Sequence, residues 1–133
     1  MVYQISVGFH RFHPLLNEII RKNSDIITFH NYFSKFWLKI HINRLKRLKR
    51  PIICTEWLNR PLGSTVEKCL PLFREENVGC FHWGLVNGKS QAHCSWFNFR
   101  PRKWQHDLFY GNYKPYDKNE IEVFKNARKR NSN

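Results

Sequence analysis

Residues 51–61 read PIICTEWLNRP, a short apolar run that ends on a carboxylate. Ile52, Ile53 and Cys54 suit a buried strand, and Glu56 follows where the run stops. An apolar run that includes β-branched residues and is bounded by prolines is typical of a strand that ends in a turn. Because acidic side chains are rarely buried without a partner, Glu56 is the first candidate for a functional residue.

Three further runs of the same kind occur in the chain: ISVGFH (5–10), DIITFH (25–30) and VGCFHWG (78–84). Each is nearly continuous in apolar residues, as parallel strands covered on both faces are. The last three strands start about one βα unit apart. The sequence therefore predicts an α/β architecture with a parallel sheet.

Helical patterns separate these runs. One begins at a proline and covers 14–20, and a longer apolar stripe covers 33–48. Capping-box signals, in which Ser or Asp is followed three residues later by Glu, occur at 64–67 and 117–120. An apolar stripe follows each signal, so we expect two further helices there.

The parallel pattern lacks the signatures of nucleotide-binding folds. Neither G-x-G-x-x-G nor G-x-x-x-x-G-K-[ST] follows a predicted strand. The remaining architecture is the (β/α)8 barrel, which typically needs roughly 250 residues, whereas this chain has 133. We therefore expect a partial (β/α)8 TIM barrel of about four C-terminal βα units over residues 1–126, followed by a basic disordered tail at 127–133.

Polar and aromatic side chains gather where the predicted strands end. In a barrel the active site lies at the C-terminal ends of the strands. Any one of these residues alone is more often a packing residue, but their joint placement indicates a site. The strand ends carry His10, then His30, Asn31 and Tyr32, then Glu56 and Trp57, then His82 and Trp83.

These residue types suit a carbohydrate ligand. Sugar rings stack on aromatic side chains, for which Trp83 offers a platform, and their hydroxyls need polar contacts such as His30 and Asn31. A carboxylate beside a tyrosine hydroxyl can attack an anomeric carbon, while a second carboxyl group protonates the leaving oxygen.

Three stretches resemble the last strands of glycoside hydrolase family 5-type enzymes, the cellulase and mannanase relatives among retaining glycosidases. They are SDIITFHNY (24–32), RPIICTEWLNRPLGST (50–65) and VGCFHWGLVNGKSQ (78–91), and the resemblance covers 5–126. It implies that Glu56 is the nucleophile, with Tyr32 and His30 in the catalytic group. It further implies that Trp83 lies under the sugar. Because Asn31 and Trp57 also follow strand ends, we expect them to bind substrate as well.

The family's first four strands, which carry the acid/base glutamate, have no counterpart here. We therefore expect a catalytic-domain fragment of a retaining enzyme for β-linked polysaccharides or oligosaccharides, inactive alone, which pairs with a missing N-terminal half or with itself. The alternative is a non-catalytic carbohydrate-binding or assembly module. We expect no cofactor and no metal, because the spacing of Cys80, His82, His93 and Cys94 matches no common zinc pattern.

The net charge of +13 raises the alternative of nucleic-acid binding. In the densest run, RLKRLKR (44–50), leucines interleave the charges at helical spacing, so a solvated helix face is favoured. No apolar run reaches the roughly 18 residues of a membrane helix, so we expect no membrane partner. The start, MVYQISVGFHRF (1–12), lacks a signal-peptide layout, and the sequence indicates no location, although the family is often secreted or periplasmic.

Overall fold

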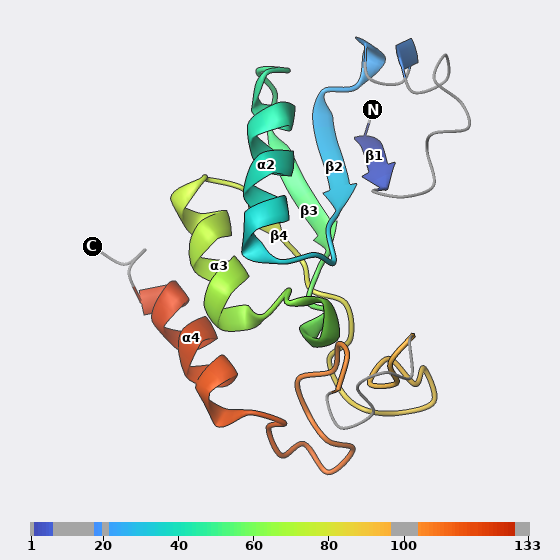
Figure 1. Cartoon of the computed structure of the whole chain (residues 1–133), viewed down its shortest axis with the longest axis vertical. Helices are drawn as coiled ribbons and strands as arrows, with labels where there is room; N and C mark the ends of the chain where they lie inside the picture. Colours follow the sequence, from blue (N-terminus) through green and yellow to red (C-terminus); the bar gives the residue numbers. More distant parts are fainter. Residues whose placement is uncertain (1, 7–17, 20–21, 97–103, 130–133) are drawn as a thin grey trace.

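The computed structural model describes residues 2–6, 18–19, 22–96 and 104–129. Four parallel strands form one sheet in chain order. The strands are β1 (Val2–Ser6), β2 (Ile26–His30), β3 (Ile52–Glu56) and β4 (Gly79–Cys80). Within the described ranges the helices are α2 (Lys35–Lys46), α3 (Val66–Glu75) and α4 (Lys118–Lys129), with a short 3-10 helix, η2 (Arg60–Leu62) (Figure 1).

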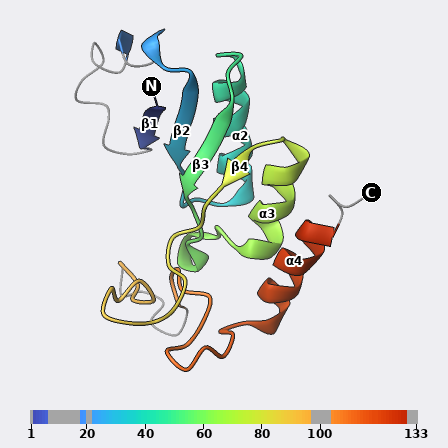
Figure 2. The same ribbon diagram turned by 180° about the vertical axis from the view of Figure 1, so that it is seen from behind.

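Helices α2 and α3 cover one face of the sheet, as the two opposite views show (Figures 1 and 2). The core lies between this face and the helices, and full burial of one large apolar side chain contributes about 1.5–3 kcal/mol. Among the described residues, no helix is both long and apolar enough to cross a membrane. The core includes Ile27, Phe29, Ile52, Cys54, Leu38, Ile42, Val66, Cys69, Leu72 and Phe73.

The sequence of α2 explains its place and its direction. Leu38, Ile42 and Leu45 are buried and recur at helical spacing, so one stripe faces the sheet. Lys39 and Lys46 both bind the carboxylate of Glu76, the C-cap residue of α3, and so link the two helices. Because α2 connects two parallel strands, it runs antiparallel to them. Its basic C-terminal end therefore lies at the end of the sheet where the strands begin, opposite their C-terminal ends.

The capping-box expectation is wrong for α3 and holds in part for α4. Thr65 precedes the first residue of α3 without a side-chain cap, whereas the hydroxyl of Ser64 accepts a hydrogen bond from the Leu58 N–H (3.3 Å). At α4, Asp117 Oδ1 accepts from the Asn119 N–H (2.8 Å), as an N-cap does. Glu120 instead forms a buried ion pair with Arg60.

The expectation of a partial TIM barrel is wrong, because the structure is a small α/β domain with an open sheet. β1 and β4 are the two ends of the ladder, and they do not pair with each other. β4 has only two residues, and within the described ranges no helix follows it before α4. Barrel closure needs strands whose tilt and stagger agree around the whole ring, which four strands with so short a last member do not supply.

Several predicted features fall partly or wholly outside the described residues. β1 lies at 2–6, and the rest of the strand predicted at 5–10, with His10, lies outside. The helix predicted at 14–20 is described only at 18–19. Of the tail predicted at 127–133, the first three residues belong to α4 and 130–133 lie outside.

Two irregular segments, 81–96 and 104–117, take the place of a fourth barrel-like unit. Both lie at the end of the sheet to which the strands point (Figures 1 and 2). They are joined by backbone hydrogen bonds, among them Asn87 N–H to Phe109 O (2.8 Å) and Gln105 N–H to His93 O (3.0 Å). This end of the domain is therefore built from contacts between residues distant in sequence.

Candidate active site

The candidate site lies where β2 and β3 end side by side. His30 is the register partner of Glu56, and a shift in the pairing occurs between Phe29 and His30. The ladder continues one step further, because the Asn31 N–H donates to Glu56 O (2.9 Å). Parallel pairing therefore brings the last residues of both strands to the same end of the sheet.

The carboxylate of Glu56 is held by two side chains from the end of β2. The Tyr32 hydroxyl donates a hydrogen bond to Oε2, and His30 Nδ1 lies 3.0 Å from the same oxygen. The side chains of His30 and Glu56 are 14% and 23% exposed, so the group is sheltered but accessible. Burial, followed by the hydrogen bond to Glu56, raises the pKa of Tyr32, so its phenol remains a proton donor.

Trp96 and His106 complete this cluster, although neither was expected from the sequence. The ring of Trp96 meets the ring of Tyr32 edge-on at 5.0 Å, and the ring of His106 lies 5.3 Å from that of Tyr32. Trp96 is 55% exposed, so its ring can receive a ligand, whereas His106 is buried. Both residues come from the irregular segments, and no local pattern marks them.

A chain of hydrogen bonds fixes the orientation of His106 and anchors Trp96. The Trp96 N–H donates to Gln105 Oε1 (2.6 Å), and the Gln105 amide lies 2.8 Å from His106 Nε2. His106 Nδ1 contacts Leu58 O, which requires the proton to be on Nδ1 and leaves Nε2 as an acceptor. Burial lowers the pKa of His106 to about 4, which is consistent with this neutral form.

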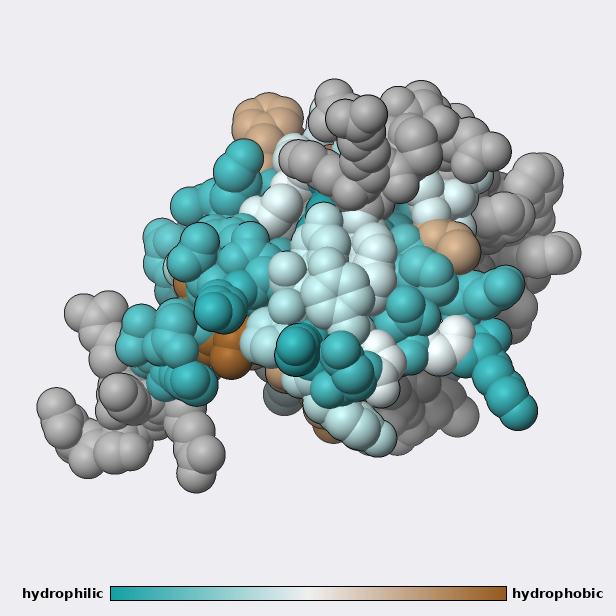
Figure 3. All heavy atoms as spheres, turned by 90° about the horizontal axis from the view of Figure 1, so that it is seen from below, coloured by the Kyte–Doolittle hydropathy of each residue, from teal (hydrophilic) through white to brown (hydrophobic). Residues whose placement is uncertain are grey.

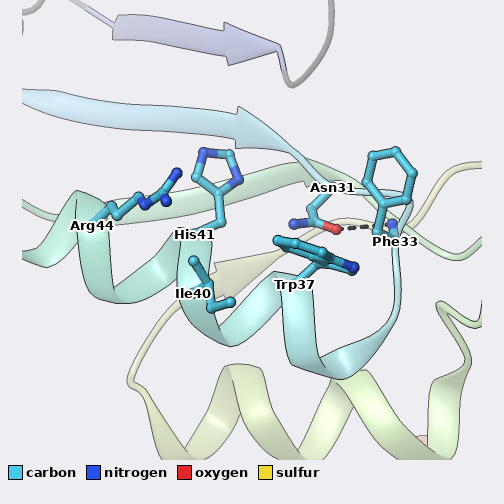
Figure 4. A pocket seen from close by; sticks show the side chains of 6 residues that line it. All are labelled: Asn31, Phe33, Trp37, Ile40, His41 and Arg44. Carbon is cyan, nitrogen blue, oxygen red and sulfur yellow. Dashed lines mark hydrogen bonds between the residues drawn. The ribbon is translucent and has the colours of Figure 1, made fainter.

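Asn31 and Trp57 do not join the Glu56 cluster. The side chain of Asn31 is buried and accepts from the Phe33 N–H (2.9 Å), at a hollow of about 450 Å³ between β2 and α2 (Figure 4). Trp57 is fully buried and packs on Phe73 and Phe124, so its indole is a core side chain here. For Asn31 the alternation of side chains explains this, because His30 and Tyr32 lie on one side of the chain and the residue between them on the other. Trp57 lies beyond the last residue of β3.

Trp83 is on the surface at the same end of the domain. It is 47% exposed, and its N–H donates to Trp57 O (3.0 Å), which places its backbone beside the residue that follows Glu56. Figure 3 looks onto the end to which the strands point and shows residues of intermediate hydropathy at its centre, flanked by hydrophilic ones. Two exposed tryptophans, Trp83 and Trp96, thus lie at this end of the domain.

No second carboxylate joins the Glu56 cluster among the described residues, which include all ten acidic residues of the chain. Asp25 precedes β2, about 16 Å from its other end at ~3.3 Å per residue. Asp107 is buried and lies 3.7 Å from His93. The others are on helices, at their ends or before β2: Glu18, Glu67, Glu75, Glu76, Asp117, Glu120 and Glu122.

In the part of the chain that the structure describes, no group of three or more His, Cys, Asp or Glu side chains is placed to hold a metal ion. His82 lies against Trp57 and Phe124, and burial lowers its pKa. Comparison of the chain with protein-family models, with curated proteins and with solved structures found no match. The site's interpretation therefore depends on its own geometry.

Proposed function

We propose that Glu56 is the nucleophilic carboxylate of a retaining glycosidase centre, in line with the resemblance to family 5-type glycoside hydrolases. The observation that supports this is the convergence of the Tyr32 hydroxyl and His30 Nδ1 on Glu56 Oε2. A carboxylate held by donors in one orientation is pre-organised for attack. Because both contacts are on Oε2, the other oxygen, Oε1, can approach an anomeric carbon.

The surrounding residues suit the binding of a sugar. The exposed rings of Trp96 and Trp83 offer apolar faces on which a pyranose can stack. Tyr32 keeps its proton and can stabilise the glycosyl ester by donating to its oxygen. The ligand class is therefore a polysaccharide or oligosaccharide.

The chain contributes the nucleophile without the acid. Retaining hydrolysis needs a second carboxyl group about 5–5.5 Å from the first, to protonate the leaving oxygen. The contacts described for the Glu56 carboxylate are to Tyr32 and His30, and neither of them supplies a second carboxyl group. The acid would therefore come from outside residues 1–133, and ordinary glycosides should not be turned over by these residues alone.

A glycoside whose leaving group needs no protonation separates the two roles. We expect 2,4-dinitrophenyl 2-deoxy-2-fluoro-β-glycosides of glucose, mannose or xylose to leave one glycosyl group on the peptide that contains Glu56, detected by mass spectrometry. Glu56→Gln should abolish the adduct. The matched control, Glu122→Gln, removes an exposed carboxylate on α4 that pairs with Lys125 and should label normally.

The alternative, a non-catalytic carbohydrate-binding module, gives a different result. It requires that titration with oligosaccharides shows binding while none of the three fluoroglycosides modifies Glu56. Binding without an adduct, or an adduct that survives Glu56→Gln, would contradict the assignment of the nucleophile. The basic end of α2 lies at the opposite edge of the sheet and takes no part in this site.

A further inference from the structure

A second cluster of reactive groups lies in the irregular segments, apart from the Glu56 cluster. Cys94 Sγ is 3.5 Å from His93 Nε2, and His93 Nδ1 is 3.7 Å from Asp107 Oδ2. The imidazole thus has a thiol at one nitrogen and a carboxylate at the other. This is the order of nucleophile, base and orienting acid found in catalytic triads, in which Nε2 faces the nucleophile and Nδ1 the acid.

The environment of Asp107 is the strongest argument that this cluster is functional. Its side chain is fully buried, and neither carboxylate oxygen has a hydrogen bond of normal geometry within the described residues. His93 Nδ1 is likewise buried without such a partner. The two orphaned groups face each other, and a closure of less than 1 Å would satisfy both at ordinary hydrogen-bond distance.

The backbone around Asp107 leaves its carboxylate little freedom to turn away. Gly84 has φ +81°, and a Cβ at this position would lie 2.6 Å from Asp107 Oδ1. Burial raises the pKa of Asp107, and the charges of His93 and Arg60 oppose that shift. The Asp107 carboxylate is therefore placed to orient the imidazole of His93.

His93 is also held in place, while Cys94 is open to solvent. The ring of His93 packs on Trp104 at 5.2 Å, and its carbonyl accepts from the Gln105 N–H. Cys94 is exposed, whereas Cys54 and Cys69 are buried. Burial raises the pKa of the half-buried Cys80 to about 11, so that thiol stays protonated at neutral pH.

We propose that Cys94 is a nucleophilic thiol, with His93 as its base and Asp107 as the positioning residue, that accepts an acyl group from an ester. Its proton passes to His93 Nε2 as Sγ bonds to the carbonyl carbon. The carbon–oxygen bond of the ester then breaks, and the departing alkoxide takes the proton from His93. Water, deprotonated by His93, then attacks the thioester carbon, the carbon–sulfur bond breaks, and the thiolate takes its proton back from His93. The net reaction is ester and water to acid and alcohol.

This activity goes beyond the glycosidase proposal and does not depend on it. The probe is p-nitrophenyl acetate, added to the full chain, with release of p-nitrophenolate followed by absorbance and the acetylated peptide identified by mass spectrometry. We expect acetylation of Cys94 at least tenfold faster at pH 7 than acetylation of the thiol of glutathione. Cys94→Ser should remove the rapid phase, whereas Cys80→Ala, which removes a less accessible thiol, should leave it unchanged.

The variants of the two partners distinguish activation from simple exposure. His93→Gln should lower the acetylation rate at pH 7 by tenfold or more and shift its rise to the alkaline range of a free thiol, roughly pH 8.5. Asp107→Asn should lower the rate less. Near-UV circular dichroism shows whether the Asp107→Asn variant is folded. If it is not, the rate of His93→Gln decides between activation of the thiol and simple exposure. Acetylation of Cys94 no faster than that of glutathione, or a rate unaffected by His93→Gln, would overturn the proposal.

Discussion

Two glutamates in this domain show opposite uses of the same side chain. Glu120 is 3% exposed, and its two oxygens accept from Arg60 Nε and Nη2 at 2.7 and 2.6 Å. Glu56 is 23% exposed, and one of its oxygens is contacted by a phenol and an imidazole. A carboxylate closed off by a bidentate guanidinium serves structure, whereas one held on a single oxygen at an open edge remains available for chemistry.

The Arg60–Glu120 pair belongs to a buried network that joins distant parts of the chain. Arg60 also donates to the carbonyls of Trp104 and Asp107, at 3.2 and 3.1 Å, and its guanidinium lies over the ring of Tyr116. The network links η2 to the segment 104–117 and to α4. Because Arg60 and Glu120 are both buried, loss of one of them leaves the charge of the other buried and unbalanced.

The largest effect on stability is expected when the buried Arg60–Glu120 pair is broken. Glu120→Gln should lower the free energy of unfolding by about 3–5 kcal/mol, because the Arg60 charge stays buried without its counter-charge. Chemical denaturation measures it. Glu122→Gln, two residues along α4 in an exposed pair, is the control and should change stability by no more than about 0.5 kcal/mol. Equal effects of the two substitutions would show that the Arg60 pair contributes little.

The second prediction concerns His106, which lies between the two regions. Its pKa is about 4 in the folded chain and 6.5 in the unfolded one, so the unfolded state gains its proton first as the pH falls. Stability present above pH 6.5 should decline between pH 6.5 and 4, by on the order of 2–3 kcal/mol for this group.

The variant His106→Asn isolates that contribution, because every other titrating group remains in both proteins. Its denaturation midpoint should fall less steeply than that of the unaltered chain over the same pH range. Parallel pH profiles for the two proteins would show that His106 is not held neutral by its contacts with Gln105 and Leu58.

The third prediction concerns the exposed ring of Trp96, which lies beside Tyr32 in the Glu56 cluster. Trp96→Ala should weaken oligosaccharide binding by on the order of 1 kcal/mol, about fivefold in Kd, because a stacking face is lost. Titration calorimetry measures the change. Trp37→Ala is the matched control, since Trp37 is equally exposed (56% against 55%) but lies on α2. A loss of the same size from Trp37→Ala would place the sugar at the hollow of Figure 4 instead.

The smallest effect is expected for stability at the open carboxylate. Glu56→Gln and Tyr32→Phe should each change the free energy of unfolding by less than about 1 kcal/mol, because the group is accessible to water and its hydroxyl donor is neutral. Thermal or chemical denaturation of both variants beside Glu120→Gln gives the ranking. A loss from Glu56→Gln as large as that from Glu120→Gln would make Glu56 a structural residue.

The local features of the fold could be predicted, and its closure could not. The strands at 25–30 and 51–56 and the helix within 33–48 agree with β2, β3 and α2. Apolar runs and periodic stripes reflect which faces are buried, so they reveal the elements. The barrel expectation failed because strand number and length around a ring are properties of the assembled sheet, and β4 is too short to carry it further.

The candidate site shows the same division. Tyr32, His30 and Glu56 were selected because they end neighbouring strands, and the structure brings these three side chains together. Trp57, next to Glu56 in sequence, lies in the core instead. The proposed catalytic and binding roles of Tyr32, His30 and Glu56 remain predictions, which the fluoroglycoside experiment tests.

The sequence by itself determined the elements and the residues at their ends, because backbone periodicity assigns each side chain to a face. Only the tertiary structure decided which residues meet. Trp96 contacts Tyr32, and Asp107 lies near His93, through segments without regular periodicity. Glu120 lies on the regular helix α4, but its partner Arg60 is 60 residues away in the sequence. Such contacts depend on how loops pack at one end of the sheet, and loop packing is set by many weak long-range contacts that no short stretch of sequence records.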